Sequence, residues 1–412
     1  MIPKNLQLYK FSAYGFLKNQ RFFEIFIFLF FLEQSISFLQ IGLLISIREI
    51  SILLFEIPTG IIADSFGRRS SMIFCFFVYI LSFLIFFLFP GFLYYSIGMI
   101  LFALGEAFRT GTHKALILEY LKINNLLHLK VEYYGYTRSW SQIGSAFAAL
   151  VAAVIVSYSG SYKYVFLGST IPYLLALGLM FSYPKELDCQ KKKERNLLTN
   201  IKMSLRITFS SLKISIKQTQ LKRALLNSAI FDGIFKTVKD YIQPILQILV
   251  LAAPIFLHFE KREAIIIAIV YFNLYILTAV ASRHSGRLKN RFVLLSKAVN
   301  SSFLIGILII FFSGILLNLK LEIVVVLLFI LMFVLQNMRR PINIGYISEN
   351  ISHDVMASGL SVESQLKTLC VAVMSPLMGF LADRSNIGVA FIILSSLTLL
   401  IFPLIKVSEN QK

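Results

Sequence analysis

Charged residues occur inside long apolar stretches of this sequence, and one pair suggests proton chemistry. In "GEAFRTGTHK", Glu106 and Arg109 are three residues apart, which brings both side chains to one face of a helix. A buried carboxylate takes up a proton when burial raises its pKa, and releases it when an arginine approaches. This pair is therefore the first candidate for carrying a proton.

Further ionisable and polar groups fall in other apolar stretches. An ionisable side chain near the centre of a bilayer costs several kcal/mol unless it is paired or hydrated, so such residues are functional candidates. The further candidates for proton coupling are Glu24, Glu49 and Asp232, and those for lining a substrate cavity are Arg21, Arg48, Arg138, Gln142, Lys236, Gln336 and Glu363. The alternative is that these charges form structural pairs between helices. The size of the set favours a polar, mixed-charge central cavity.

The composition indicates whether the chain is surrounded mainly by water or by lipid. The 412 residues are 57% hydrophobic and 15% charged, whereas a soluble domain carries about 25% charged residues. That much apolar surface does not fit into one aqueous core, so the sequence predicts an integral membrane protein. The three scattered cysteines give neither a disulfide framework nor a metal-binding spacing.

The length of the apolar stretches predicts the fold class. A helix that crosses about 30 Å of hydrocarbon needs about 20 residues. With this length the sequence divides into twelve spans, at 12–32, 40–62, 71–89, 94–117, 134–156, 163–182, 222–247, 263–282, 292–316, 321–345, 357–381 and 387–406. We therefore expect an all-α membrane protein with two pseudo-symmetric six-helix bundles, 1–183 and 222–412, joined by a basic linker, 184–221.

The distribution of basic residues predicts the orientation. The segment from Lys185 to Arg223 holds eleven Lys and Arg residues. If the N-terminus is cytoplasmic, this segment and the turn with Arg68 and Arg69 are cytoplasmic too, which satisfies the positive-inside rule with both termini inside. The same distribution accounts for much of the net charge of +19 without nucleic acid, and no basic aromatic module of the known nucleic-acid-binding kinds is present.

Motifs for catalysis or cofactor binding are not found in the sequence. It has no Gly-x-x-x-x-Gly-Lys-Ser/Thr loop for ATP and no Gly-x-Ser-x-Gly nucleophile turn, and its five scattered histidines give no metal cluster. We expect neither an enzyme nor a cofactor.

The turn "GIIADSFGRR" between the second and third spans combines an acid with two arginines in a glycine-flanked reversal. Gly60 and Gly67 permit the reversal. The carboxylate of Asp64 can bind an arginine or a helix N-terminus, whereas the simplest alternative is a plain basic hairpin. The turn resembles motif A of the major facilitator superfamily, with the match on Gly60, Asp64, Gly67, Arg68 and Arg69. The resemblance implies a cytoplasmic latch that favours the outward-facing state.

Three other stretches were compared with the family's pattern. Arg109 resembles the span-four arginine of motif B, although Thr112 and His113 stand in place of its Gln-Gly. The run 144–149 keeps the small residues of motif C, which is typical of antiporters, but lacks its proline; close helix packing is the simpler explanation. The stretch "GFLADRSNIG", 379–388, is expected to be a helix terminus and turn.

The resemblance implies a secondary transporter that works by alternating access. We expect proton-coupled efflux of a drug or metabolite, with protons and a small molecule as partners, in a monomer. The abundance of Phe, Ile and Lys fits an AT-rich genome and a bacterial inner membrane. The alternatives are uptake by proton symport, and a receptor or scaffold that binds without transporting.

Overall fold

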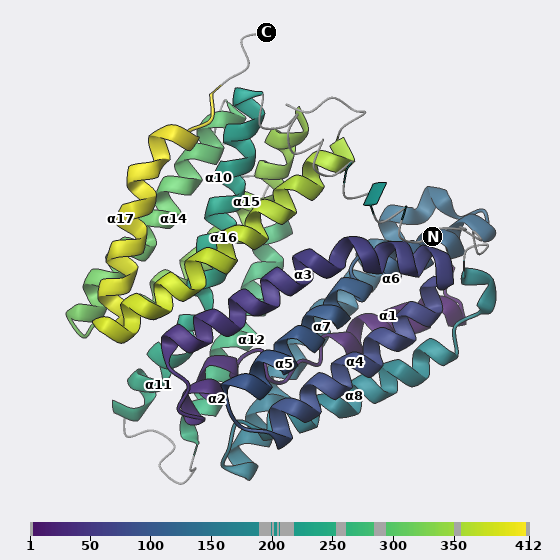
Figure 1. Cartoon of the computed structure of the whole chain (residues 1–412), viewed down its shortest axis with the longest axis horizontal. Coiled ribbons are helices and arrows are strands. Elements are labelled where there is room, and N and C mark those ends of the chain that lie inside the picture. The colour runs from purple at the N-terminus through teal and green to yellow at the C-terminus, as the bar shows by residue number, and fades with distance from the viewer. Residues whose placement is uncertain are drawn as a thin grey trace. The chain divides into compact units, whose positions relative to one another are not determined.

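The computed structural model is built of helices and describes residues 3–188, 199, 202–203, 206, 218–252, 261–283, 294–349 and 356–408, where it contains no strand. It divides into two compact units (Figure 1). The first unit is 1–34, 50–204 and 256–272, and the second unit is 35–49, 205–255 and 273–412.

The helices of the first unit come mainly from the first half of the chain. They are α1 (Leu6–Lys18), α2 (Ile27–Glu33), α4 (Arg68–Leu88), α5 (Phe92–Arg109), α6 (Thr112–Ile123), α7 (Lys130–Ser159) and α8 (Tyr164–Phe181), with short 3₁₀ turns at Leu127–Leu129 and Lys185–Leu187. Within this unit α4 packs against α5 and α8, and α1 packs against α7 and α8.

The second unit is built mainly from the second half of the chain. Its helices are α10 (Thr219–Val238), the 3₁₀ turn η3 (Lys239–Tyr241), α11 (Ile242–Ala252), α14 (Leu295–Asn318), α15 (Glu322–Glu349), α16 (Met356–Arg384) and α17 (Ile387–Ile405). Two long helices, α3 (Phe38–Phe66) and α12 (Arg262–Arg283), contribute residues to both units.

The twelve predicted spans agree with the helices, with three corrections, of which one is the interruption of the fourth span, 94–117, at Thr110 and Gly111 between α5 and α6. In the described residues, ten helical segments are long and apolar enough to cross a membrane. The predicted first span, 12–32, is not one helix, because residues 19–26 form turns between α1 and α2. The predicted seventh span, 222–247, is interrupted by η3 between α10 and α11. In both places polar residues replace the apolar run that a continuous membrane helix requires.

Aromatic side chains, in which the sequence is rich, form the core of the first unit. The Phe166 ring stacks on Phe23 and Phe86 with centroids 5.2 and 4.8 Å apart, and meets Phe30 edge-on at 4.6 Å. Such ring pairs add about 0.5–1.5 kcal/mol each beyond their buried area. The rings hold α2, α4 and α8 together and surround the polar groups described below.

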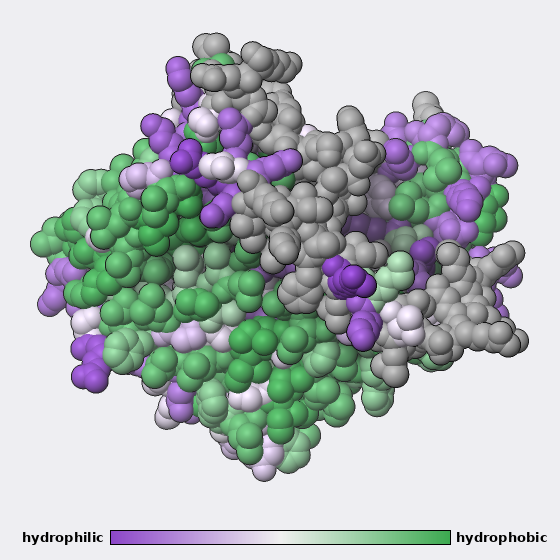
Figure 2. Space-filling model, turned by 45° about the horizontal axis from the view of Figure 1, so that its top comes forward, coloured by the Kyte–Doolittle hydropathy of each residue, from purple (hydrophilic) through white to green (hydrophobic). Residues whose placement is uncertain are grey.

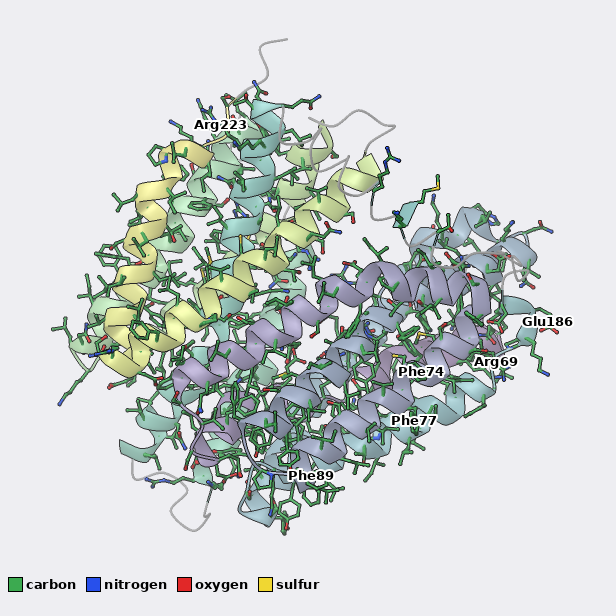
Figure 3. All side chains as sticks on the ribbon, in the orientation of Figure 1. Arg69, Phe74, Phe77, Phe89, Glu186 and Arg223 are labelled. Atoms are coloured by element: carbon green, nitrogen blue, oxygen red, sulfur yellow. The ribbon has the colours of Figure 1, made fainter. Side chains whose placement is uncertain are left out.

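Other aromatic side chains face outward. Phe74 and Phe77 lie on α4 and Phe89 directly follows its last residue (Figure 3); the three are 45%, 57% and 46% exposed. Apolar residues gather over much of the face seen in Figure 2. Exposed apolar surface of this extent fits contact with lipid, in which such side chains are at home.

Glycine allows α3 and α16 to approach closely within the second unit. A Cβ at Gly42 would lie 2.3 Å from the Ser375 carbonyl oxygen, and one at Gly379 would lie 2.1 Å from that of Phe38. The Asp383 carboxylate accepts the backbone N–H groups of Phe38 and Leu39 at 3.0 and 2.8 Å. Asp383, in the stretch expected to be only a helix terminus, therefore caps the N-terminus of α3.

The run of small residues in α7 has a packing role in the first unit. A Cβ at Gly144 would lie 2.6 Å from the Phe16 carbonyl oxygen, and one at Gly15 would lie 2.9 Å from that of Thr137. The Gln20 side chain donates to the Gly144 carbonyl at 3.0 Å. The small residues thus let α1 lie directly on α7, as expected for close packing between membrane helices.

The Gly144→Ala variant is expected to be destabilised by about 1–3 kcal/mol, because its methyl group would collide with backbone rather than a movable side chain. Gly178→Ala is the matched control on α8: its Cβ would meet nothing within 4 Å, so it is expected to be neutral or to gain up to about 1 kcal/mol. Thermal unfolding of both purified proteins in the same detergent is the measurement. Equal melting temperatures would contradict the packing role of Gly144.

Candidate functional site

The Glu106 carboxylate is held between two arginines inside the first unit. Arg109 Nη2 lies 2.5 Å from Glu106 Oε2, and Arg21 Nη2 forms an ion pair with Glu106 Oε1. The Tyr79 hydroxyl donates to Glu106 Oε1 at 2.5 Å. The three charged side chains are only 14–21% exposed. We call Arg21, Glu106 and Arg109 the first-unit triad.

Tyrosines fix both guanidinium groups in this triad. Arg21 Nε donates to the Tyr173 hydroxyl at 2.9 Å, and Arg109 Nε donates to the Tyr79 hydroxyl at 3.2 Å. The Tyr173 hydroxyl in turn donates to the Lys18 carbonyl at 2.9 Å. The Arg21 guanidinium also lies 5.2 Å from the centre of the Phe102 ring. Each arginine is therefore oriented by a hydrogen bond to a tyrosine, and Arg21 also by an aromatic ring.

The break in the first predicted span positions Arg21. After α1 ends at Lys18, the Asn19 side chain donates to the Ser141 carbonyl at 2.5 Å and to the Ser145 hydroxyl at 3.1 Å. These bonds fasten the turn to α7, while the Phe22 backbone N–H of the turn donates to the Ser169 hydroxyl at 3.1 Å. Arg21 thereby faces Glu106 on α5, which is 85 residues away along the chain.

A second polar cluster lies inside the second unit around Asp232 of α10. Lys367 Nζ of α16 lies 3.0 Å from Asp232 Oδ2, and Gln336 Nε2 of α15 donates to Asp232 Oδ1 at 2.7 Å. One helical turn away, the Ser228 hydroxyl donates to Glu363 at 2.7 Å. These bonds tie α10, α15 and α16 together.

Arg339 is sealed inside the same unit. It is 1% exposed, donates from Nη2 to the Asn227 amide oxygen at 2.5 Å, and lies 4.2 Å from the centre of the Phe231 ring. Within the described residues its Nε has no hydrogen-bond partner. A buried guanidinium with an amide and a ring for partners is costly, and its closure to solvent excludes it from first contact with a substrate.

Glu49 of α3 is also paired within the second unit. It is 3% exposed and lies 2.9 Å from Arg48 Nη2 and 3.5 Å from Lys236 Nζ. The predicted candidates Arg48, Glu49 and Lys236 are thus brought together.

The remaining candidates lie apart from these clusters. Glu24 is exposed, in the turn that follows Arg21. On α7, Arg138 is exposed and Gln142 is half-buried. Arg21 and Glu24 lie between α1 and α2, outside both helices, and Arg21 pairs with Glu106.

At the glycine-flanked turn after α3, a residue that follows α8 caps the start of α4, and a residue of α4 caps the end of α8. We call this reciprocal capping an exchange of caps. Asp64 Oδ1 lies 3.2 Å from Arg68 Nη2. Gly67 has a φ of +108°, a conformation that favours glycine. The Asp188 carboxylate accepts the Arg69 backbone N–H at 2.6 Å, and the Arg69 guanidinium donates to the Met180 and Phe181 carbonyls at 3.1 and 2.6 Å.

This exchange joins the ends of two helices. A carboxylate sits at the N-terminus of α4, and a cation sits at the C-terminus of α8, so both charges match the helix dipoles. Figure 3 labels Arg69 at the start of α4, near Glu186.

A further buried group of charges lies in the first unit near the start of α8. Lys261 Nζ lies 2.9 Å from Glu33, whose carboxylate also accepts from the Tyr162 backbone N–H at 3.0 Å. The Tyr162 hydroxyl donates to Glu263 at 2.7 Å. Burial, and then the Glu263 carboxylate, raise the pKa of Tyr162 above its ordinary value, so this hydroxyl stays protonated and remains a donor.

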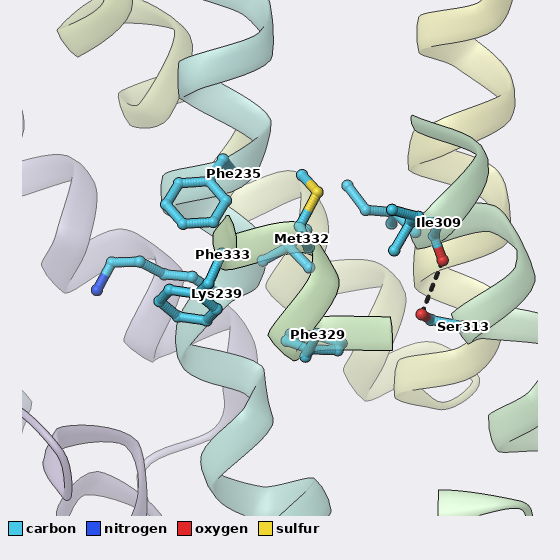
Figure 4. Close-up of a pocket in the computed structure, with 9 residues that line it drawn as sticks. Phe235, Lys239, Ile309, Ser313, Phe329, Met332 and Phe333 are labelled. Atoms are coloured by element: carbon cyan, nitrogen blue, oxygen red, sulfur yellow. Dashed lines mark hydrogen bonds between the residues drawn. The ribbon is translucent and has the colours of Figure 1, made fainter. Parts of the chain in front are cut away.

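One pocket lies within the second unit between α10, α14 and α15 (Figure 4). Phe235, Phe329, Met332 and Phe333 line it, and the Ser313 hydroxyl at its edge donates to the Ile309 carbonyl. Its empty volume of ≈ 250 Å³ is below the roughly 300–1,000 Å³ of small-molecule sites. Its size and apolar lining make it a packing void.

Sequence reasoning did not single out the residues that complete these sites. Tyr79 and Tyr173 orient the two arginines, Asn227 holds Arg339, and Asp188 caps α4. The available signal for Tyr79 was a hydroxyl within the phenylalanine-rich run "FCFFVYILSF". Asp188 stood in the linker with no motif around it.

A bundle of apolar helices with charged clusters inside it defines a multi-pass integral membrane protein of the transporter type. The chain belongs to the Major Facilitator Superfamily, whose family model matches residues 19–366. The family resemblance and the fold class predicted from the sequence are confirmed.

Known proteins extend this comparison. An uncharacterized MFS-type transporter of Bacillus subtilis (strain 168), YxaM, is 35% identical over 104 residues, which are 25% of this chain and 26% of that protein. The match thus spans about a quarter of that relative's length.

Solved transporters show the same fold at low identity. A variant of the nucleoside transporter NupG has a TM-score of 0.75 at 14% identity, covering 97% of this chain and 98% of that one. A D-xylose–proton symporter has a TM-score of 0.70 at 14% identity, covering 98% of both chains. A POT family transporter in complex with 5-aminolevulinic acid has a TM-score of 0.68 at 15% identity, covering 97% and 93%.

Removing one partner of the Asp232–Lys367 pair should destabilise the protein. Asp232→Asn leaves the Lys367 ammonium buried without a counter-charge, at an expected cost of about 3 kcal/mol or more. The double variant Asp232→Asn/Lys367→Met should recover most of this loss. The measurement is the melting temperature in detergent.

The exposed Asp64–Arg68 pair is the control for this prediction. Asp64 is 68% exposed, so Asp64→Asn should cost less than about 1 kcal/mol. A double variant as unstable as Asp232→Asn alone would show that the destabilisation does not come from the unpaired lysine.

Proposed function

We propose that the protein moves a small organic solute across the membrane by alternating access, and that this movement is coupled to protons at Glu106. The observation that carries the proposal is the first-unit triad, a carboxylate buried at membrane depth and held by two arginines and a tyrosine hydroxyl. Membership of the family supports transport by alternating access, and the triad adds a titratable group inside the transporter.

A carboxylate couples protons to movement only if its surroundings differ between two conformations. The groups that face Glu106 are Arg21 and Lys18 from the first span, Tyr79 and Cys75 from α4, Arg109 from α5, and Tyr14 and Tyr173 from α1 and α8. The triad joins residues from separate elements, because Arg21 lies in the turn after α1 and the other two lie on α5. A shift of that turn away from α5 would remove one arginine and favour protonation.

Glu24, Glu49 and Asp232 are the other proposed proton carriers. Asp232 and Glu49 each have a lysine partner within their unit, and Glu24 is exposed. Only Glu106 lies between two arginines. This distinction places Glu106 first.

The turn after α3 is proposed as the conformational latch implied by motif A. Its residues Gly60, Asp64, Gly67, Arg68 and Arg69 carry that role. The exposure of Asp64 supports the proposal, because the ion pair of a carboxylate that is 68% exposed can be broken and re-formed without a large desolvation cost.

Two modes of coupling are considered. Export by proton antiport follows from the antiporter-like small residues at 144–149. Those residues already have a packing role between α1 and α7, so they add no weight to export. Uptake by proton symport is supported by the pairing of two arginines with Glu106. A proton bound to Glu106 would free both arginines at the same moment. A receptor or scaffold without transport is the third candidate.

The setting of this activity is also proposed from the sequence. The protein acts as a monomer in a bacterial inner membrane with both termini in the cytoplasm. The moving parts are the halves 1–183 and 222–412, joined by the linker 184–221. The distribution of basic residues supports the orientation.

Glu106→Gln should abolish substrate-dependent proton movement. Inside-out vesicles are energised to an acidic interior, and a pH-sensitive dye follows proton flux as a compound panel is added. Proton release from the lumen on addition of a compound indicates antiport. Symport is tested by loading the compound inside and following its exit together with protons. Glu132→Gln, an exposed carboxylate on α7, is the matched control.

Three outcomes separate the candidates. Compound-dependent proton flux that is retained in Glu132→Gln and lost in Glu106→Gln supports the proposal. Flux that persists in Glu106→Gln moves the carrier to Glu24, Glu49 or Asp232. Binding of a compound without any flux of compound or proton would overturn transport and favour the receptor.

A further inference from the structure

The first-unit triad has more positive than negative charge. Two guanidinium groups share the single carboxylate of Glu106. Lys18 lies three residues before Arg21 and acts electrostatically on Arg21, Arg109 and Glu106. Two cations therefore share one anion in a region where an uncompensated charge is costly.

Both arginines keep part of their hydrogen-bonding capacity free. Each guanidinium uses Nε for a tyrosine and Nη2 for Glu106. Within the described part of the chain, Arg21 makes no hydrogen bond through Nη1, whereas Arg109 has the Tyr14 hydroxyl as a further hydrogen-bond partner. The side chains of Arg21 and Arg109 are 17% and 21% exposed. A ligand can therefore reach both groups, which is not so for the sealed Arg339.

The guanidinium fork is matched to planar or tetrahedral oxyanions. Carboxylates and phosphates accept two parallel N–H bonds from an arginine, and these charge-assisted bonds are shorter and about twice as strong as neutral ones. A cationic ligand would meet the like charges of the two arginines here, and a neutral one would leave the surplus charge uncompensated.

We propose that the solute carries an anionic group, a carboxylate or a phosphate, and that Arg21 and Arg109 bind this group when Glu106 is protonated. The proposal rests on the proposed transport function and names the substrate class for its site. The proton stays on Glu106, and the oxygens of the solute replace those of Glu106 on the two Nη2 atoms. No covalent bond forms or breaks.

The exchange predicts the sense of coupling. Because the anion binds only after the proton, both occupy the protein together and move in the same direction. This is the logic of symport, in contrast to antiport, where proton and substrate compete for one carboxylate.

The test is ligand binding by the purified full-length protein, without transport. Thermal shift in detergent is measured with a panel of small carboxylates and phosphate esters, and with neutral and cationic analogues of the same size, such as benzoate, phenyl phosphate, benzamide and benzylamine. We expect the stabilising compounds to be anions. Their affinity should rise as the pH falls, because protonated Glu106 releases the arginines.

The variants separate the roles of the triad residues. Arg21→Gln or Arg109→Gln should weaken anion binding about tenfold or more, which corresponds to about 1.4 kcal/mol or more. The affinity of Arg109→Lys for anions should lie between those of wild type and Arg109→Gln, since lysine keeps the positive charge but lacks the two parallel N–H donors of the guanidinium. Glu106→Gln, which mimics the protonated acid, should bind anions at least as tightly as wild type and without pH dependence. Arg384→Gln, an exposed arginine on α16, is the control.

Several results would overturn the proposal. Stabilisation by neutral or cationic compounds but not by anions would do so, as would anion binding that persists in both arginine variants. If Glu106→Gln does not fold, the pH dependence of wild-type binding decides instead, and an affinity that does not rise at low pH contradicts the exchange. If no anion stabilises either wild type or Glu106→Gln, the site is not an anion site.

Failure of the broader function gives a different result. Anion binding with the expected variant pattern, but no proton flux in vesicles, would support the anion site and contradict the proposed proton coupling. Proton flux driven by neutral compounds would support proton-coupled transport and contradict the proposal that the solute is an anion.

Discussion

Burying the charge of Glu106 is the constraint on which the first unit depends. An isolated carboxylate at membrane depth would not stay ionised, so the unit brings two arginines and a tyrosine hydroxyl to it. Arg21 reaches it only because the first span breaks after Lys18. The break is tolerated because Asn19 and Gln20 bond to α7, and those bonds require the close approach that Gly144 permits.

The two units handle their buried charges differently. In the second unit, Asp232 has Lys367 and Gln336, Glu363 has a hydroxyl, and Glu49 has Arg48 and Lys236. Each acid there has its own partners, which suits a framework that holds α10, α15 and α16 together. In the first unit one acid, Glu106, pairs with two arginines whose side chains are partly exposed.

Much of the architecture could be predicted from hydropathy alone, because a bilayer imposes one length and one polarity on every spanning helix. The breaks near Arg21 and at η3 could not, because their polar side chains are satisfied by residues distant in sequence. The spacing of Glu106 and Arg109 predicted their pairing, since three residues form one helical turn. The pairing with Arg21 spans 85 residues and leaves no local trace, and tyrosines in aromatic runs resemble core residues.

The exchange of caps between Arg69 and Asp188 has a mechanical consequence for the segment that follows. Asp188 lies near the start of the basic linker, 184–221, and its carboxylate accepts the Arg69 backbone N–H at the start of α4. The linker is therefore anchored at the turn after α3 rather than at the end of α8. The backbone of Gly67 lies against the Asp188 carboxyl group, so the start of the linker and the turn after α3 share one residue.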